Sequence, residues 1–368
     1  MRVAYDSQIF AMQEYGGISR YFCQLAQRLF ANPGMEAKIF APVHINAYLS
    51  ALPSNLVCGN HIRAIPKTGK LRHAVNAATS WPMVKYFQSD IVHHTYYLPA
   101  TYAPKGARRV ITVYDMIHER FSTLFPRSDR TSIGKKRIIN KVDHVICISE
   151  NTRRDLLELF DLSGDNVSVV HLGFDRLKEP AAPLLESLAT EQPPYLLYVG
   201  LRGGYKNFSG LLRAFAGSSW LRQNFHIVCF GGGPLQTAEL NLIAQSGISP
   251  QQISQVSGDD AKLAAYYRQA AAFVYPSLYE GFGIPPLEAM SLDCPVICSN
   301  TSSIPEVVGP AAEYFDPGDV DSIRLALERT LESPERRNEL IKLGRERYTQ
   351  FTWDRCTQST LEKYRSLL

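Results

Sequence analysis

Short apolar runs alternate along the chain with longer stretches whose apolar positions recur at helical spacing. In the first half these runs are Val3–Tyr5, Lys38–Ala41, Ile91–His94, Val110–Tyr114, Val142–Ser149 and Val167–Val170. In the second half they are Tyr195–Val199, Phe225–Phe230, Gln252–Val256, Ala271–Tyr275, Pro295–Ser299 and Glu313–Phe315. Buried strands that alternate with amphipathic helices are typical of a parallel sheet covered by helices on both faces. The sequence therefore predicts an α/β protein with two Rossmann-like, doubly wound parallel sheets.

A proline-rich stretch without clear periodicity interrupts this alternation at residues 178–194. A chain of 368 residues usually holds about two domains, since one domain takes roughly 150 residues. We therefore predict a first domain over residues 1–177, a linker over 178–194 and a second domain over 195–350. Helical periodicity runs from Val320 to Gln350 and again from Trp353 to Leu368.

Composition narrows the class of protein. The chain is 45% hydrophobic and 20% charged, as in ordinary globular enzymes. No window reaches the roughly 18 to 20 apolar residues of a membrane span, and Asp6 stands where a signal peptide needs apolar residues. The seven cysteines include no Cys-x-x-Cys pair, which favours buried thiols over disulfides or a zinc site. We expect a cytoplasmic protein.

Charge is distributed unequally between the two halves. Residues 1–180 carry 23 Lys and Arg against 15 Asp and Glu, whereas residues 181–368 carry 16 against 20. A basic first half attracts anionic lipid headgroups or phosphorylated acceptors, or it is simply a solvated face. The first alternative predicts peripheral contact with the inner face of the cytoplasmic membrane.

The usual nucleotide-binding loops are missing. Neither Gly-x-Gly-x-x-Gly nor Gly-x-x-x-x-Gly-Lys-Ser/Thr occurs, which excludes the common nicotinamide dehydrogenases and P-loop proteins. Asp319 and Asp321 form an Asp-x-Asp pattern, but they open a helical stretch where carboxylates cap backbone N–H groups. We interpret this pair as a helix cap and predict no metal site.

The segment from Tyr275 to Met290 carries the strongest chemical signal. A strand ends at Tyr275, a glycine-rich turn follows, and prolines open a helix, so the amides of Gly283 and Ile284 are free to face an anion. Glu280 and Glu288 stand eight positions apart around this turn. One carboxylate can reach a bound sugar, and the other can accept two hydroxyl hydrogen bonds.

This segment resembles the Glu-x7-Glu signature of the retaining glycosyltransferases of GT-B family 4. Further motifs of that family follow in the same order along nearly the whole chain: Gly16–Tyr21, Val113–Asp115 with His118, Ile148–Thr152, Val199–Gly200 with Lys206–Asn207, Gly231–Pro234 and Ile304–Gly309. The resemblance implies two Rossmann-like domains that face each other across a cleft. It also implies that residues 351–368 return to the first domain.

The resemblance assigns most donor contacts to the second domain. Glu288 would bind the nucleotide ribose, while Glu280 and the amides of Phe282 and Gly283 would hold hydroxyls of the sugar. Ile284 and Leu287 are the further residues of this segment that the resemblance assigns to donor binding. Arg202 and Lys206 resemble the basic pair on the donor diphosphate, although the loop around Arg202 departs from the family pattern and makes Lys206 the safer assignment.

The remaining assignments keep a structural alternative. Gly16 and Gly17 would let backbone amides approach the diphosphate, or they form a plain turn. Asp115 and His118 would lie near the sugar or acceptor, or they are a capping Asp and a packed His, since the family's His-Asp dipeptide is Tyr-Asp here. Ser257, in the loop Val256–Asp260, would seat the base, or this loop is an ordinary helix cap.

These observations predict a retaining, metal-independent glycosyltransferase without a cofactor of its own. Members with this segment look most like mannosyltransferases that use GDP-mannose to extend a lipid-linked oligosaccharide in O-antigen or surface-polysaccharide synthesis. The alternatives are a UDP-glucose, UDP-N-acetylglucosamine or GDP-rhamnose transferase, a nucleotide-sugar epimerase, and a non-catalytic sugar-binding protein.

Overall fold

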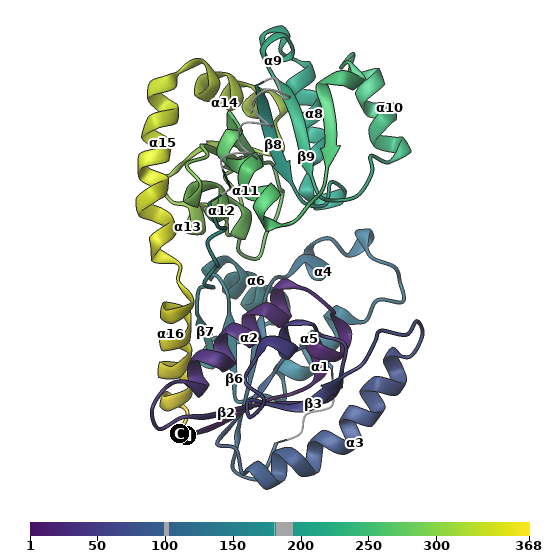
Figure 1. The fold of residues 1–368 in the computed structure, drawn as a ribbon, viewed down its shortest axis with the longest axis vertical. Coiled ribbons are helices and arrows are strands. Elements are labelled where there is room, and N and C mark those ends of the chain that lie inside the picture. The colour runs from purple at the N-terminus through teal and green to yellow at the C-terminus, as the bar shows by residue number, and fades with distance from the viewer. Residues whose placement is uncertain (99–102, 180, 182–193) are drawn as a thin grey trace. The chain divides into compact units, whose positions relative to one another are not determined.

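A computed structural model describes residues 1–98, 103–179, 181 and 194–368. The chain forms two compact units (Figure 1). Unit 1 consists of Met1–Gly173 together with Thr352–Leu368, and unit 2 consists of Phe174–Phe351. Most of the expected linker, residues 180 and 182–193, lies outside the described residues.

Unit 1 contains a parallel sheet with the strand order β3-β2-β1-β4-β5-β6-β7. Its strands are β1 Arg2–Tyr5, β2 Glu36–His44, β3 Val57–His61, β4 Ile91–His94, β5 Arg108–Val113, β6 His144–Cys147 and β7 Val167–Val169. Tyr5 pairs with Ile39 on one side and with His93 on the other. Because all neighbours are parallel, the carboxyl ends of the strands lie at one edge of the sheet.

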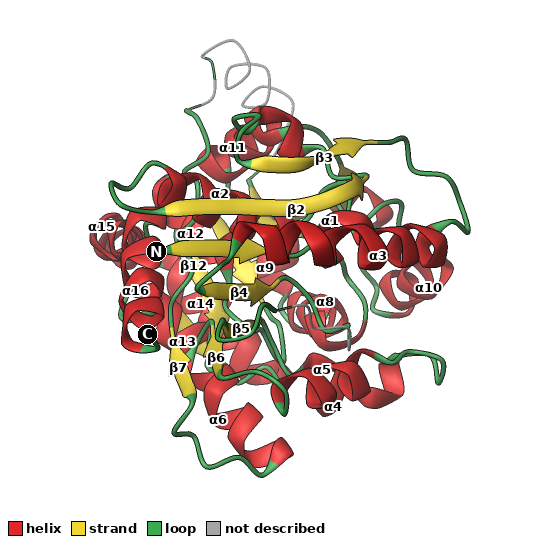
Figure 2. Cartoon of the chain, turned by 90° about the horizontal axis from the view of Figure 1, so that it is seen from below, coloured by secondary structure: helices red, strands yellow, loops and turns green. Residues whose placement is uncertain are grey.

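Helices cover both faces of this sheet. They are α1 Gln8–Met12, α2 Gly17–Phe30, α3 Gly69–Phe87, α4 Ile117–Arg120, α5 Thr131–Ile139, α6 Glu150–Phe160 and α16 Trp353–Ser366. Helix α3 packs along β2 (Figure 2). Helix α16 packs on α2, where Arg28 pairs with Asp354 at 2.8 Å. The Tyr364 hydroxyl of α16 lies 2.5 Å from Nδ1 of His93 and 3.4 Å from the Tyr5 hydroxyl.

Unit 2 contains a second parallel sheet, with the order β10-β9-β8-β11-β12-β13. Its strands are β8 Tyr195–Val199, β9 His226–Phe230, β10 Ile253–Val256, β11 Ala272–Tyr275, β12 Val296–Ser299 and β13 Ala312–Phe315. The helices are α8 Phe208–Ala216, α9 Ser219–Asn224, α10 Thr237–Gln245, α11 Asp260–Gln269, α12 Ile284–Ser291, α13 Ile304–Val308, α14 Val320–Glu332 and α15 Pro334–Arg347. The predicted pair of doubly wound sheets is confirmed.

The core of unit 2 explains why its strands were visible as apolar runs. Leu196 and Ile227 of the sheet pack with Leu211 of α8 and Leu327 of α14, and all four side chains are fully buried. Strands of a parallel sheet are covered on both faces, so they are apolar almost throughout.

Two elements differ from the prediction. Strand β3 was not predicted, because it lies at the sheet edge and three of its five residues are exposed. The helical stretch from Val320 is not continuous: it breaks at Ser333, whose hydroxyl accepts from the Arg336 amide at 3.1 Å and caps α15 before Pro334. A cap followed by proline begins a new helix.

Candidate active site

The loops that follow β8 and β11 meet at the carboxyl edge of the unit 2 sheet. These two strands are neighbours, so the segments after them lie side by side. The Leu278 amide donates to the Tyr205 carbonyl at 2.7 Å, which ties one loop to the other. Across this contact, Nζ of Lys206 lies 2.7 Å from Oε1 of Glu280. The structure therefore brings together two predicted site residues of opposite charge.

Aromatic rings surround this ion pair. Nζ of Lys206 lies 5.2 Å from the ring centre of Tyr205 and 5.9 Å from that of Tyr275. Burial, together with the charge of Glu280 and a hydrogen bond to it, raises the pKa of Tyr275 well above its usual value. The phenol thus stays protonated and donates to the carboxylate. The Lys206 side chain is 22% exposed, so this ion pair is not sealed in the core.

Two serines after β12 hold the turn that carries Glu280. The Glu280 amide donates to Oγ of Ser302 at 3.0 Å. The buried hydroxyl of Ser303 lies 2.8 Å from the Glu280 carbonyl and 2.9 Å from that of Phe282, to which it donates. Neither serine was predicted from the sequence. Their only signal was their position directly before the family motif that begins at Ile304.

Helix α12 begins where the glycine-rich turn ends. Gly283 has φ +110°, a left-handed conformation that favours glycine, and it stands at the N-cap position before Pro285 and Pro286. Pro285 and Pro286 have no N–H, so the amides of Gly283, Ile284 and Leu287 are those that this helix start can offer to an anion or a hydroxyl. The Leu287 side chain is fully buried and belongs to the core, so this predicted site residue offers only its backbone.

Glu288 lies on α12 beside a buried tyrosine. The Tyr267 hydroxyl donates to Oε2 of Glu288 at 3.3 Å. Burial and the neighbouring carboxylate raise the pKa of Tyr267 well above its usual value, which keeps this donor protonated. The glutamate is half-buried, so the contact with Tyr267 fixes a carboxylate that a ligand can still approach.

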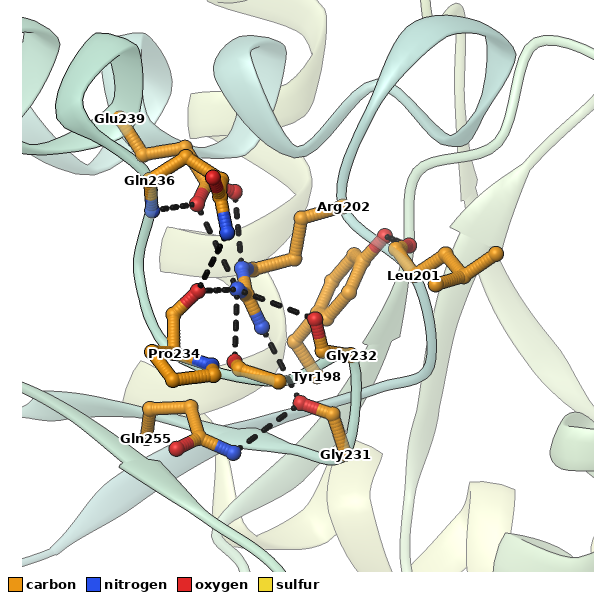
Figure 3. Close-up of polar contacts among 10 residues, drawn as sticks. Tyr198, Leu201, Arg202, Gly231, Gly232, Pro234, Gln236, Glu239 and Gln255 are labelled. Atoms are coloured by element: carbon orange, nitrogen blue, oxygen red, sulfur yellow. Dashed lines mark hydrogen bonds and ion pairs between the residues drawn. The ribbon is translucent and has the colours of Figure 1, made fainter.

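Arg202 does not accompany Lys206. Its side chain is only 2% exposed and is hydrogen-bonded to Glu239 and to carbonyl groups of residues 231–234 (Figure 3). The Arg202 guanidinium is thus engaged by groups of the protein, and its assignment with Lys206 to the donor diphosphate stays a prediction.

The loop after β10 forms a helix cap. Oδ1 of Asp259 accepts from the Lys262 amide at 2.9 Å at the start of α11, whereas Ser257 is exposed. Asp259 is thus the helix cap that was expected as an alternative for this loop. The assignment of Ser257 to the nucleotide base stays a prediction.

In unit 1, Gly16 and Gly17 begin helix α2. The Ser19 hydroxyl donates back to the Gly16 carbonyl at 3.0 Å, and a Cβ at Gly17 would meet no atom within 4 Å. Gly17 thus has an open approach to its backbone, whereas a Cβ at Gly16 would clash with the Gln13 side chain. Whether the pair serves a diphosphate stays a prediction.

Asp115 and His118 follow β5 in the same unit. Oδ1 of Asp115 accepts at 3.0 Å from the amide of Ile117, the first residue of α4. The His118 ring stacks on Phe125 with 4.0 Å between ring centres, and its Nε2 lies 3.6 Å from Asp129. This is the arrangement of the structural alternative, a capping Asp and a packed His.

Asp319 also acts as a cap. Its Oδ1 accepts from the Asp321 amide at 2.9 Å, and Asp321 pairs with Arg324 at 3.1 Å. The interpretation of this pair as a helix cap is confirmed. Within the ranges that the structure describes, no group of three or more His, Cys, Asp and Glu side chains is placed to hold a metal ion.

A buried polar pair stands at the carboxyl ends of β1 and β4. Oδ2 of Asp6 lies 2.8 Å from Nδ1 of His94, and the Thr95 hydroxyl donates to the same carboxylate at 2.6 Å. Burial favours a higher pKa for Asp6, but the hydrogen bonds from His94 and Thr95 outweigh it and hold the pKa below its usual value. Neighbouring His93 is fully buried against Thr112 and Tyr364, so both histidines have structural partners.

No helix in the described parts of the chain combines the length and the apolar character that crossing a bilayer requires.

Comparisons with known proteins agree with this arrangement. Residues 15–176 match the family described as Glycosyltransferase Family 4, and residues 185–347 match the family described as Glycosyl transferases group 1. The chain is 28% identical to O-antigen chain mannosyltransferase B of Escherichia coli, over 95% of this chain and 96% of that protein. It is 24% identical to an O-antigen chain mannosyltransferase of Salmonella typhimurium, over 87% and 88%. Sucrose-phosphate synthase of Thermosynechococcus elongatus shares the fold, with a TM-score of 0.74 and 20% identity over 100% of this chain and 98% of that one.

Proposed function

Because this chain belongs to the group 1 glycosyltransferases of family 4, we propose that it transfers mannose from GDP-mannose to a hydroxyl of a lipid-linked oligosaccharide in O-antigen or surface-polysaccharide synthesis. The observation that carries the proposal is the Lys206–Glu280 pair beside the start of α12. The choice of mannose is supported by the names of two relatives, both O-antigen chain mannosyltransferases.

The residues at the sheet edge suit a departing nucleoside diphosphate. When the bond between C1 of the sugar and the diphosphate oxygen breaks, negative charge develops on the diphosphate. Lys206 and the amides of Gly283 and Ile284 at the start of α12 stabilise that charge without a metal ion. Glu280 accepts hydrogen bonds from sugar hydroxyls, and Glu288 accepts them from the ribose.

The proposed reaction retains the configuration at C1. A double displacement needs a carboxylate nucleophile close to C1, as in retaining hydrolases, and Glu280 is already engaged by Lys206 and Tyr275. We therefore favour attack from the side on which the diphosphate leaves. The acceptor oxygen forms the new bond to C1, and its proton passes to the diphosphate.

The donor is tested by thermal stability in the presence of GDP, UDP, ADP and their sugars. A ligand that binds the folded protein at about 100 times its Kd adds about 2.7 kcal/mol to stability, so the matching nucleotide raises Tm. We expect GDP and GDP-mannose to do so. A response to UDP compounds alone would replace mannose by glucose or N-acetylglucosamine, and GDP-rhamnose is compared in the same panel.

The reaction is tested by NMR of the product formed with GDP-mannose and a lipid-linked acceptor. Retention predicts an α-linked product from the α-configured donor. Conversion of the donor sugar without use of the acceptor would instead identify an epimerase.

We also propose that unit 1 contacts the membrane through α3. Leu71, Trp81 and Tyr86 of this helix are exposed by 66%, 44% and 92%, and Lys85 lies over the Trp81 ring with 4.9 Å between Nζ and the ring centre. No Asp or Glu occurs between residues 37 and 89, whereas six Lys and Arg do. Aromatic side chains flanked by lysines suit an anionic lipid surface.

Vesicle sedimentation tests this contact. The protein should bind vesicles that contain phosphatidylglycerol more than pure phosphatidylcholine, and salt should weaken binding. Leu71→Asp and Tyr86→Asp should reduce it, and Leu240→Asp on exposed α10 is the matched control. Equal binding by all variants would contradict the role of α3.

A further inference from the structure

Arg202 stands shortly after β8, and its guanidinium is almost enclosed by its partners. Nε donates to Oε1 of Glu239 at 2.8 Å, and Nη1 donates to the Gly231 carbonyl at 3.1 Å. Nη2 donates to the Gly233 and Pro234 carbonyls, both at 2.9 Å (Figure 3). The Gly232 carbonyl lies farther away, 3.5 Å from Nη2. A guanidinium has five N–H donors and no acceptor, so this set of one carboxylate and four carbonyls suits it.

Glu239 connects this arrangement to α10. Its Oε2 accepts from the Gln236 amide at 2.6 Å, which completes the capping box at the start of the helix. The same carboxylate therefore fixes the first turn of α10 and one side of the guanidinium. Removal of the carboxylate partner leaves a buried arginine with an uncompensated charge, so Arg202 and Glu239 should act as one unit.

The loop that these residues hold has an unusual backbone. Gly231, Gly232 and Gly233 have φ values of +80°, +70° and +72°. A Cβ at Gly232 would lie 2.5 Å from the Gly200 carbonyl oxygen and 2.7 Å from Nη1 of Arg202. The glycines thus permit both the left-handed turn and the close approach of the guanidinium.

The direction of the carbonyls determines the direction of the amides. In a planar trans peptide the C=O and the next N–H point to opposite sides. Because the Gly231 carbonyl points at Arg202, the Gly232 N–H points away from it. The Gly232 carbonyl lies 3.5 Å from Nη2, which gives the Gly233 N–H the same direction.

We propose that Arg202 is a positioning residue. With Glu239, it fixes the Gly231–Pro234 turn so that the N–H groups of Gly232 and Gly233 are presented to the donor diphosphate at the edge of the unit 2 sheet. The turn follows β9, the neighbour of β8, and consecutive backbone N–H groups bind anions. This inference rests on the proposed function, because it assigns the diphosphate to these amides rather than to the arginine itself.

A double-mutant cycle separates this role from direct contact with phosphate. We expect Arg202→Ala and Glu239→Ala each to raise the donor KM by about 10-fold, with a smaller change in kcat, and the double variant to do little more than either alone. Arg213→Ala, which changes an exposed side chain of α8, is the control. If Arg202 touched phosphate directly, Glu239→Ala would free it and leave the donor KM unchanged or lower, and this result would overturn the proposal.

Hydrogen exchange of the peptide that covers residues 229–236 gives a readout independent of donor identity. Exchange in the free protein should be faster in Arg202→Ala and Glu239→Ala than in wild type or Arg213→Ala, and Arg202→Lys should be intermediate. Unchanged exchange in both alanine variants would overturn the proposal even if activity fell. If exchange is faster in the alanine variants but the protein does not bind GDP-mannose, the positioning role of Arg202 is supported and only the proposed donor is contradicted. If an alanine variant fails to fold, Glu239→Gln and Arg202→Lys answer the same question.

Discussion

The ammonium of Lys206 lies 2.7 Å from a carboxylate oxygen of Glu280, although 74 residues separate the two in the chain. The pair joins the loops after two neighbouring strands, β8 and β11. A cation thus stands beside the carboxylate at the edge of the sheet where a ligand of a doubly wound domain binds.

Lys206→Ala should lower kcat/KM by about 10- to 150-fold, because a charge-assisted hydrogen bond is worth about 1.5 to 3 kcal/mol. Steady-state kinetics with a saturating acceptor measure the loss. Lys206→Arg should keep part of the activity, and Lys342→Ala, on exposed α15, controls for the loss of a surface charge. Wild-type kinetics in Lys206→Ala would remove this residue from the site.

Glu288→Ala should raise the donor KM more than it lowers kcat, whereas Glu280→Ala should mainly lower kcat. Ribose contacts are the same in the ground and transition states, but contacts to the reacting sugar strengthen in the transition state. Tyr267→Phe removes only the hydroxyl that contacts Glu288. It should weaken donor binding by about 0.5 to 1.5 kcal/mol, the net contribution of one hydrogen bond. The opposite division between KM and kcat would mean that the two carboxylates have exchanged roles.

Activity should survive EDTA. Lys206 and the start of α12 are proposed to supply the positive charge that a divalent cation supplies elsewhere. The assay compares initial rates before and after chelation and after addition of Mg²⁺ or Mn²⁺. A loss with EDTA that either ion restores would contradict the metal-independent mechanism.

Gly232→Ala should destabilise unit 2 more than Gly233→Ala. Both variants place a Cβ on a left-handed backbone, which costs about 1 to 2 kcal/mol. Only at Gly232 does the new atom also meet the Gly200 carbonyl and Arg202, and such overpacking adds about 1 to 3 kcal/mol. Chemical denaturation measures the difference. Equal losses would show that the loop moves freely.

His93 should make stability depend on pH. Burial and the neighbouring His94 lower its pKa from 6.5 to about 3. Between pH 6.5 and 3, His93 is therefore protonated in the unfolded chain but neutral in the folded protein. The free energy of unfolding is thus unaffected by His93 above pH 6.5 and decreases as the pH falls below it. His93→Gln should flatten the dependence by up to about 1.4 kcal/mol per pH unit. An unchanged slope in urea denaturation across this range would contradict the assignment.

The sequence predicted the sheets better than the site. Strands such as β11 and β12 are covered on both faces, so their apolar runs alone identify them, whereas the exposed edge strand β3 has no such run. Glu280 and Lys206 were assigned by resemblance, but their contact depends on which strands are neighbours. The partners of Arg202 could not be predicted from the sequence. They are backbone carbonyls, and they point at the guanidinium because three successive glycines adopt left-handed conformations. For Asp115, by contrast, the sequence offered both a site role and a structural role, and its carboxylate makes the structural contact, with the Ile117 amide.

Helix α16 has a consequence for synthesis. Unit 2 is one uninterrupted stretch of chain, but unit 1 includes Thr352–Leu368. While the polypeptide leaves the ribosome, the side of unit 1 that carries Tyr5 and His93 has no Tyr364 to cover it until residues 352–368 are made. Unit 1 begins to be translated before unit 2 but is completed only after it. A nascent chain that stops before α16 would hold a finished second unit and an unfinished first one, a state that invites chaperones or proteases.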